Sequence, residues 1–376
     1  MNKDIRAIQQ MRENGRFAVD QPFTPDNLVQ EITAQISANT ASAVLVLFTI
    51  EWALYLKELG YTNITVGADD PIIENICKKR GLRYIGINDL ENNKNMKFDV
   101  VVGNPPYQNG ENSNFYKDFV ELAKERSDQV AFVVPSSMFK NLSEFTGITD
   151  YSFKGTAFTG IQLVVSWFIW QRGFAGDCTV HFGNNINVVN TEFYIAPTID
   201  AAQFQLVNSL LAKKLPGLNV QMGKLSRNKA IENNAGPVCI WSAGRKDQDF
   251  DKINIDPSLV PYLNGIGKHK VVFSGDYTTT AIGPAKYAIP EYGCALKAHF
   301  IEVNTRSEAE IVISYLNSKF VRYIIPVIKG TSTKNGKTVF KMIPAIDFTR
   351  AWTDAELYAH FNLTQDEIDL IESTVK

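Results

Sequence analysis

The sequence predicts an α/β fold with a mostly parallel sheet, followed by a second domain of the α+β class. In the first 190 residues, short β-branched runs alternate with amphipathic segments, a pattern typical of a parallel sheet buried on both faces. At 376 residues the chain is long for a single core, so we expect two domains, 1–195 and 196–376. Residues 211–350 carry 20 Lys and Arg against 11 Asp and Glu, although the whole chain has a net charge of −2. The second domain is therefore expected to be basic.

The elements of the first domain are predicted from apolar runs and their boundary residues. Thr24-Pro25 can begin a helix with proline in its first position, and the pattern extends to residue 36. Further along, the expected strands are 43–48, 63–68, 83–87, 98–103 and 129–135, and the expected helices are 51–60, 71–81 and 114–126. A β-hairpin over 160–183 is expected to form an antiparallel end of the sheet.

Polar side chains follow the predicted strands, and the most distinctive stretch is VVGNPPYQNG, residues 101–110. Here a strand stops abruptly in the stiff sequence Asn104-Pro105-Pro106-Tyr107. Prolines fix the backbone dihedral φ near about −65° and provide no N–H donor. Because ligands of open parallel sheets bind beyond the carboxyl ends of the strands, we expect the functional site at this edge.

The four residues Asn104-Pro105-Pro106-Tyr107 resemble the Asn-Pro-Pro-Tyr signature of S-adenosylmethionine-dependent N6-adenine DNA methyltransferases. The order of elements resembles the gamma-class arrangement of restriction-modification enzymes and their phage relatives. This resemblance implies a Rossmann-like methyltransferase catalytic domain at 1–195, with S-adenosylmethionine as cofactor. It also implies a target-recognition domain at 196–376 that binds double-stranded DNA, and it is compatible with a restriction or methyltransferase partner subunit.

The chemistry of adenine methylation explains why such a loop needs these residues. The N6 amine is a poor nucleophile because its lone pair is delocalised into the ring. The side-chain oxygen of Asn104 and the carbonyl oxygen of Pro105 can accept its two protons in hydrogen bonds, with Pro106 stiffening the loop. Tyr107 offers a flat face for a base that has been flipped out of the duplex. The structural alternative is a Pro-Pro turn with an Asn cap and a packed Tyr.

The resemblance implies cofactor contacts at six positions that precede the loop: Thr24, Pro25, Phe48, Glu51, Asp69 and Asp89. The two aspartates match the acids expected to bind the ribose hydroxyls and the adenine amino group of the cofactor. The sequence departs from the family at the end of the first strand, because no glycine lies between Ser42 and Gly60 where a Gly-rich loop is expected. Alternatively, the aspartates are helix or loop caps and Thr24-Pro25 simply begins a helix.

A basic segment in the second domain is the expected DNA-binding surface. Residues 320–346 contain no acidic residue, and a loop with Gly and Thr between two apolar stretches suits phosphate contact. The candidate phosphate contacts are Lys329, Lys334, Lys337 and Lys341. A solvated surface loop is the alternative interpretation.

Composition excludes several other classes of protein. No apolar run reaches the roughly 18 residues that a membrane span needs, and the N-terminus has charges where a signal peptide needs an apolar core. We therefore expect a cytoplasmic protein, in a bacterium or a phage-infected host, without a membrane partner. The four cysteines form no Cys-x-x-Cys pair and the four histidines do not cluster with them, so no metal is expected.

Two classes of function remain open at this point. An active adenine-N6 methyltransferase is favoured, because binding DNA alone gives no evident reason to keep Asn104-Pro105-Pro106-Tyr107 intact. The missing glycine loop favours a methyltransferase-like subunit that binds DNA or a partner without using the cofactor. Transfer of a group other than methyl to the same amine is a third possibility.

Overall fold

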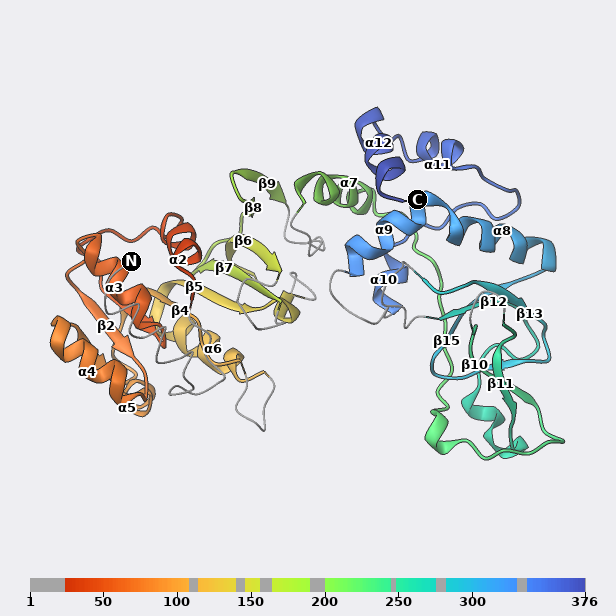
Figure 1. The fold of residues 1–376 in the computed structure, drawn as a ribbon, viewed down its shortest axis with the longest axis horizontal. Coiled ribbons are helices and arrows are strands. Elements are labelled where there is room, and N and C mark those ends of the chain that lie inside the picture. Colours follow the sequence, from red (N-terminus) through yellow and green to blue (C-terminus); the bar gives the residue numbers. More distant parts are fainter. Residues whose placement is uncertain are drawn as a thin grey trace. The chain divides into compact units, whose positions relative to one another are not determined.

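The computed structural model describes residues 24–107, 114–139, 146–155, 164–189, 200–244, 248–274, 282–329 and 337–375. The chain divides into two compact units, Met1–Ile195 and Ala196–Lys376. Each unit is described by itself below (Figure 1).

Unit 1 is a Rossmann-like α/β fold built on one large sheet (Figure 1). The described strands are ordered β3-β2-β1-β4-β5-β7-β6-β8-β9. The first five are parallel neighbours, whereas β7 pairs antiparallel with both β5 and β6. The strands are β1 Val44–Leu47, β2 Ile64–Gly67, β3 Arg83–Ile85, β4 Phe98–Gly103, β5 Ser127–Pro135, β6 Ile148–Gly155, β7 Val165–Gln171, β8 Cys178–Phe182 and β9 Asn185–Val189. The α/β fold predicted from the sequence is confirmed.

Helices connect or flank the parallel strands of this sheet. They are α2 Asp26–Thr33, α3 Ile50–Glu58, α4 Pro71–Arg80, α5 Ile87–Asn92, α6 Tyr116–Arg126 and the 3₁₀ helix η1 Ser136–Phe139. Helix α4 shows how the local sequence determines where a helix begins and ends. The Asp70 carboxylate accepts hydrogen bonds from the backbone N–H groups of Ile72 and Ile73, and Gly81 ends the helix with φ of 61°. The central strands β1 and β2 are buried along their whole length, which explains their continuous apolar runs.

Three details of the predicted elements are wrong. The hairpin over 160–183 does not form, because β7 and β8 are separated in the sheet by β6, which the sequence pattern did not reveal. Strand β3 ends at Ile85 and the short helix α5 begins at Ile87, where a longer strand was expected. Helix α2 begins at Asp26 with Pro25 as its N-cap, one residue later than expected.

Unit 2 combines two small sheets with a group of helices. The sheets have the orders β11-β10-β14 and β13-β12-β15. The strands are β10 Val238–Ser242, β11 Asp251–Asn254, β12 His269–Ser274, β13 Lys286–Ala288, β14 Gly293–Cys294 and β15 Ala298–Val303. The helices are α7 Ala201–Ala212, η3 Arg227–Lys229, η4 Pro257–Tyr262, α8 Arg306–Asn317, α9 Lys319–Lys329, α10 Lys337–Lys341, α11 Asp354–His360 and α12 Gln365–Thr374. This is the α+β composition that the sequence predicts.

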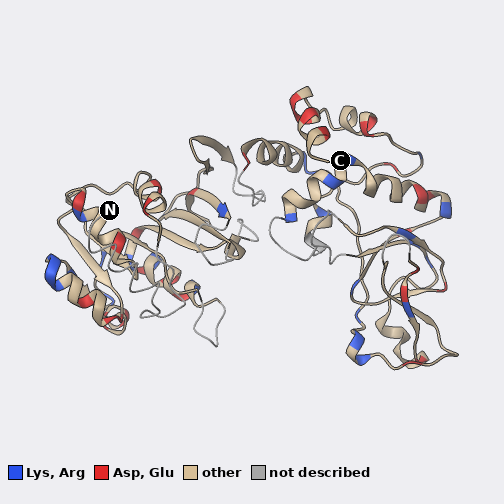
Figure 2. Ribbon diagram, in the orientation of Figure 1, with Lys and Arg blue, Asp and Glu red and all other residues tan. Residues whose placement is uncertain are grey.

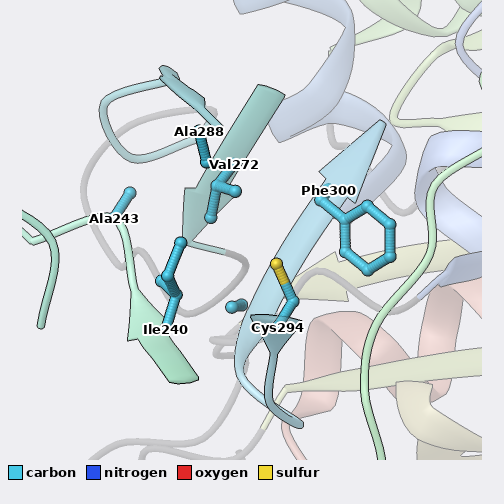
Figure 3. Packing of buried hydrophobic residues seen from close by; sticks show 7 residues of the cluster. Ile240, Ala243, Val272, Ala288, Cys294 and Phe300 are labelled. Carbon is cyan, nitrogen blue, oxygen red and sulfur yellow. The ribbon is translucent and has the colours of Figure 1, made fainter. Parts of the chain in front are cut away.

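A shared apolar core joins the two sheets of unit 2. Ile240 on β10 and Cys294 on β14 come from one sheet, and Val272 on β12 and Phe300 on β15 come from the other. All four are fully buried and lie in one cluster (Figure 3). Burial of this apolar surface stabilises the sheets as a single body.

Within the described ranges, no single helix is long and apolar enough to cross a membrane. Helices α8 and α9 reach that length and apolar composition only when taken together, and they are bent by 61° where they meet. The same ranges contain no group of three or more His, Cys, Asp or Glu side chains that could hold a metal ion. All four cysteines are buried free thiols. Burial raises the pKa of the Cys77 thiol to about 11, so this side chain stays protonated near neutral pH.

Candidate active site

The candidate site forms where three adjacent parallel strands end. Leu47 on β1 is in register with Gly67 on β2 and with Gly103 on β4. A Cβ atom on Gly103 would lie 2.5 Å from the carbonyl oxygen of Leu47, which is closer than real side chains approach. Glycine at this position therefore lets β4 lie against β1 up to its last residue. Asn104, the residue after Gly103, therefore lies at the carboxyl edge of the sheet.

The Asn104 side chain is buried and joined to the N-terminal segment. Its Nδ2 atom donates a hydrogen bond of 3.3 Å to Thr24 Oγ1. The backbone N–H of Thr24 in turn donates to Glu51 Oε1 over 2.8 Å. Thr24, Glu51 and Asn104 are each at most 3% exposed. The structure thus brings together three residues that the sequence predicted separately, and the bond from Nδ2 fixes the orientation of the amide group.

Pro105, Pro106 and Tyr107 follow Asn104 in the loop. Pro105 is buried and Pro106 is half-buried. The Tyr107 ring is buried and meets the Tyr116 ring at the start of α6 edge-on, with 6.4 Å between centroids and 88° between planes. Burial raises the pKa of the Tyr107 hydroxyl well above its usual value, partly opposed by a hydrogen bond with Asn104. Tyr107 therefore stays a neutral phenol, and stacking on a base requires the ring to become accessible.

Phe48 occupies the end of β1, where the sequence lacks the expected glycine loop. Its φ is 65°, in the left-handed region that a phenylalanine rarely adopts. Its backbone N–H donates to the Gly67 carbonyl oxygen over 3.0 Å, and its ring packs edge-on against Phe119 of α6 with centroids 4.7 Å apart. The backbone thus makes a turn suited to glycine while the side chain fills the space beside it.

Asp69 and Asp89 are exposed carboxylates on neighbouring segments at the same edge of the sheet. The ideal position of a Cβ atom on Gly86 lies 3.4 Å from Asp69 Oδ1 and 3.7 Å from Asp89 Oδ2, so both carboxylates flank the same point. Asp69 Oδ1 also accepts a hydrogen bond of 2.8 Å from the backbone N–H of Ile87. The cap of α4 is Asp70, so the expected alternative role of Asp69 as that cap is wrong. Asp89 lies in the first turn of α5.

The region that holds these residues can be compared with known families. Residues 50–156 match the Eco57I restriction-modification methylase family. The match begins at α3, after β1, and includes both aspartates and the Asn104 loop, but not Thr24 or Phe48. It supports a methyltransferase of a restriction-modification system over this part of the chain. No curated protein matches the sequence.

Several solved structures are similar to this chain at low sequence identity. A DrdV–DNA complex is 11% identical, covering 86% of this chain and 54% of that chain with a TM-score of 0.42. The M protein of the type I restriction enzyme EcoKI is 17% identical, covering 43% and 48% with a TM-score of 0.36. A type I restriction-modification methyltransferase subunit from Streptococcus thermophilus is 13% identical, covering 43% and 46% with a TM-score of 0.36. The chain spans about half the length of each of these three proteins.

The four lysines expected to contact DNA lie in different surroundings. Helix α9 continues through Lys329, which is buried and not in an exposed loop as expected. Lys334 lies outside the described residues, and Lys337 begins α10, although its side chain is not described. Lys341, at the end of α10, is exposed. Of these four lysines, only Lys341 is thus seen to have the exposed side chain that a phosphate contact requires.

The acidic residues of unit 2 have a distribution of their own. Helices α11 and α12 carry acidic side chains in their first turns, and Figure 2 shows acids gathered along both helices. Both helices begin with a capping box, formed by Thr353 with Glu356 and by Thr364 with Glu367. The excess of basic residues in 211–350 is therefore partly offset by the acids of the last two helices, and residues 196–376 together carry 21 Lys and Arg against 18 Asp and Glu.

Proposed function

We propose that the protein transfers a methyl group from S-adenosylmethionine to the N6 amine of adenine in double-stranded DNA, after the base has been flipped out of the helix. The observation that carries this proposal is the fixed Asn104 amide at the carboxyl end of β4, inside a region that matches a restriction-modification methylase family. Unit 2 is proposed to hold and recognise the DNA.

The chemistry requires two hydrogen-bond acceptors at one point. The bond from Asn104 Nδ2 to Thr24 places the amide nitrogen toward the N-terminal segment, so the amide oxygen faces another direction. The carbonyl group of Pro105 follows in a backbone held by two consecutive prolines. Both oxygens can accept protons from the adenine amine and favour a tetrahedral nitrogen in the transition state. The proton is lost after the methyl group has been transferred, so no carboxylate base is needed.

The strand ends partly suit a nucleoside cofactor. When bound, S-adenosylmethionine supplies a methyl group on a sulfonium sulfur. The transfer is favourable because this sulfur leaves as a neutral thioether. Asp69 at the end of β2 is exposed and can accept hydrogen bonds from the ribose hydroxyls, as an acid at a second strand end does for nucleotides. Asp89 beside it can accept from the adenine amino group. Phe48 is the residue that fits least, because its ring lies where the glycine loop is expected.

The same Phe48 favours a second candidate, a methyltransferase-like subunit that binds DNA or a partner subunit without using the cofactor. Calorimetric titration with S-adenosylmethionine, with and without DNA, separates the two candidates. Binding by the wild type supports the enzyme. Absence of binding by the wild type, together with binding by Phe48→Gly, supports the subunit whose cofactor site is closed by the ring.

The product identifies the reaction. The protein is incubated with tritium-labelled S-adenosylmethionine and a DNA library, and the digested nucleosides are analysed by mass spectrometry. We expect N6-methyl-2′-deoxyadenosine. Modified cytosine would contradict the proposed role of the Asn104 loop, and a modified adenine carrying another group would assign a different transfer reaction to the same site.

A further inference from the structure

The buried arginine Arg126 joins two parts of unit 1 that lie far apart in the sequence. It is the last residue of α6 and is only 2% exposed. Its Nη2 atom donates to the carbonyl oxygens of Leu90 and Glu91 over 3.2 and 3.1 Å, and its Nη1 atom donates to the carbonyl oxygen of Lys94 over 3.3 Å. These acceptors lie in and just after the last turn of α5. A cation is favourable there because the last carbonyl groups of a helix have no partners within the helix.

Helix α5 depends on contacts from outside itself. It has six residues, which is too short for a helix to be stable alone in water. Its N-cap residue Gly86 supplies no side-chain cap. Instead, the Asp69 carboxylate accepts from the N–H of Ile87 at its beginning, and Arg126 donates to carbonyl groups at its end. The two contacts hold opposite ends of the helix that carries Asp89.

Helix α6 also reaches the catalytic loop. It begins at Tyr116, whose ring meets Tyr107 edge-on. It has eleven residues and ends at Arg126, which corresponds to about 16 Å of helix. One helix therefore touches the loop that holds Asn104 with its first residue and the helix that holds Asp89 with its last.

We propose that Arg126 is a positioning residue that orders α5 and thereby holds Asp89 beside Asp69, ready to contact the cofactor. This inference rests on the proposed function only for the identity of the ligand. In this proposal, Arg126 contacts neither the cofactor nor the DNA. It acts through the position of Asp89.

The test compares three variants with the wild type by amide hydrogen exchange without ligand. The informative amides are those of Leu90 and Asn93, which donate to the carbonyl oxygens of Gly86 and Asp89 within α5. Arg126→Ala should raise their exchange by about ten-fold or more. Arg126→Lys, which keeps the charge but cannot reach three carbonyl groups at once, should have an intermediate effect. Arg172→Ala is the matched control, because Arg172 donates to the carbonyl oxygen of Ser127 and to Asp128, which belong to β5 and not to α5.

Chemical rescue tests the role of the guanidinium group directly. Arg126 and Arg172 both line a surface pocket of about 280 Å³, through which a small cation can enter. Millimolar N-ethylguanidine should restore protection of Leu90 and Asn93 in Arg126→Ala and leave the wild type unchanged. Calorimetry should show S-adenosylmethionine binding weakened by about ten-fold in Arg126→Ala if only about one tenth of the molecules keep α5 ordered. At saturating cofactor, kcat should change by less than about two-fold, because Arg126 does not touch the reacting atoms.

Unchanged exchange at Leu90 and Asn93 in Arg126→Ala would overturn the inference, as would an equal rise throughout unit 1, which indicates general destabilisation. A loss of kcat with no change in cofactor affinity would also overturn it. If the wild type binds no S-adenosylmethionine, the proposed function fails, whereas the exchange comparison still decides whether Arg126 orders α5.

Discussion

The left-handed backbone at Phe48 should reverse the usual stability order of an alanine and a glycine substitution, and this reversal can be tested. Phe48 has φ of 65° and its side chain is buried against Phe119. Phe48→Ala and Phe48→Gly both remove the same ring contact, so both variants should be less stable than the wild type by about 3 to 5 kcal/mol. The two variants differ in whether a Cβ atom remains in the left-handed conformation.

The difference between the variants can be worked out from two opposing terms. Keeping a Cβ atom at positive φ costs Ala about 1 to 2 kcal/mol. Gly avoids this cost but loses about 0.5 to 1 kcal/mol more through the entropy of its unfolded chain. With both terms taken at the middle of their ranges, Phe48→Gly should be more stable than Phe48→Ala by about 0.75 kcal/mol. At an ordinary negative φ the order is reversed, so the sign of the difference reports the backbone conformation.

The assay is urea unfolding of both variants, monitored by circular dichroism and analysed with a common slope. Thermal unfolding should show a midpoint about 1 to 4 °C higher for Phe48→Gly, as expected for a domain of this size. Phe48→Leu serves as a control that keeps an apolar side chain at the same φ. If Phe48→Ala is as stable as Phe48→Gly or more stable, the backbone at this position is not strained and our account of the end of β1 is wrong.

Three further predictions concern the proposed reaction. Asn104→Ala should lower the single-turnover methyl-transfer rate by about two decades, or about 3 kcal/mol, with DNA affinity nearly unchanged; full activity in this variant would refute the acceptor role. Tyr107→Phe keeps the ring against Tyr116 and should leave the flipped state nearly unchanged, whereas Tyr107→Ala should weaken the flipped state by about 1 to 3 kcal/mol, measured by the fluorescence of 2-aminopurine at the target position. Neutralising Lys334, Lys337 and Lys341 together should weaken binding to all DNA sequences alike and flatten the plot of log Kd against log salt by about 0.9 per lost contact; an unchanged slope would assign these lysines to a solvated surface.

The parallel half of the sheet could be predicted because its strands are buried on both faces. Continuous apolar runs such as Val44–Leu47 are typical of strands buried on both faces, and the polar residues that follow them mark the edge where ligands of open parallel sheets bind. The local pattern therefore indicated that Asn104 and both aspartates follow strand ends, whereas their expected roles came from the resemblance to adenine methyltransferases. What it did not show was that Thr24 and Asn104, 80 residues apart, share a hydrogen bond.

Strand β6 was missed because polar side chains interrupt its apolar pattern. Asp150 and Lys154 lie within the strand and are paired with residues from elsewhere, His181 at 2.7 Å and Glu31 at 2.5 Å. Such pairing satisfies polar groups that would otherwise be costly inside a sheet, but it is visible only in three dimensions. Similarly, Lys329 was expected in a loop because a stretch with Gly and Thr follows it, yet α9 continues through Lys329 with most of its residues buried.

The position of β7 between β5 and β6 has a consequence for how unit 1 assembles during synthesis. β6 precedes β7 in the chain but pairs with β7 and β8, not with β5. It therefore has no edge to join until residues 165–171 have left the ribosome, while β1 to β5 can already pair with one another. During this interval β5 presents an open edge, which is the kind of surface on which nascent chains aggregate. Expression should thus be more sensitive to mutations that weaken the pairing of β5 with β7 than to equally destabilising changes at the β3 edge.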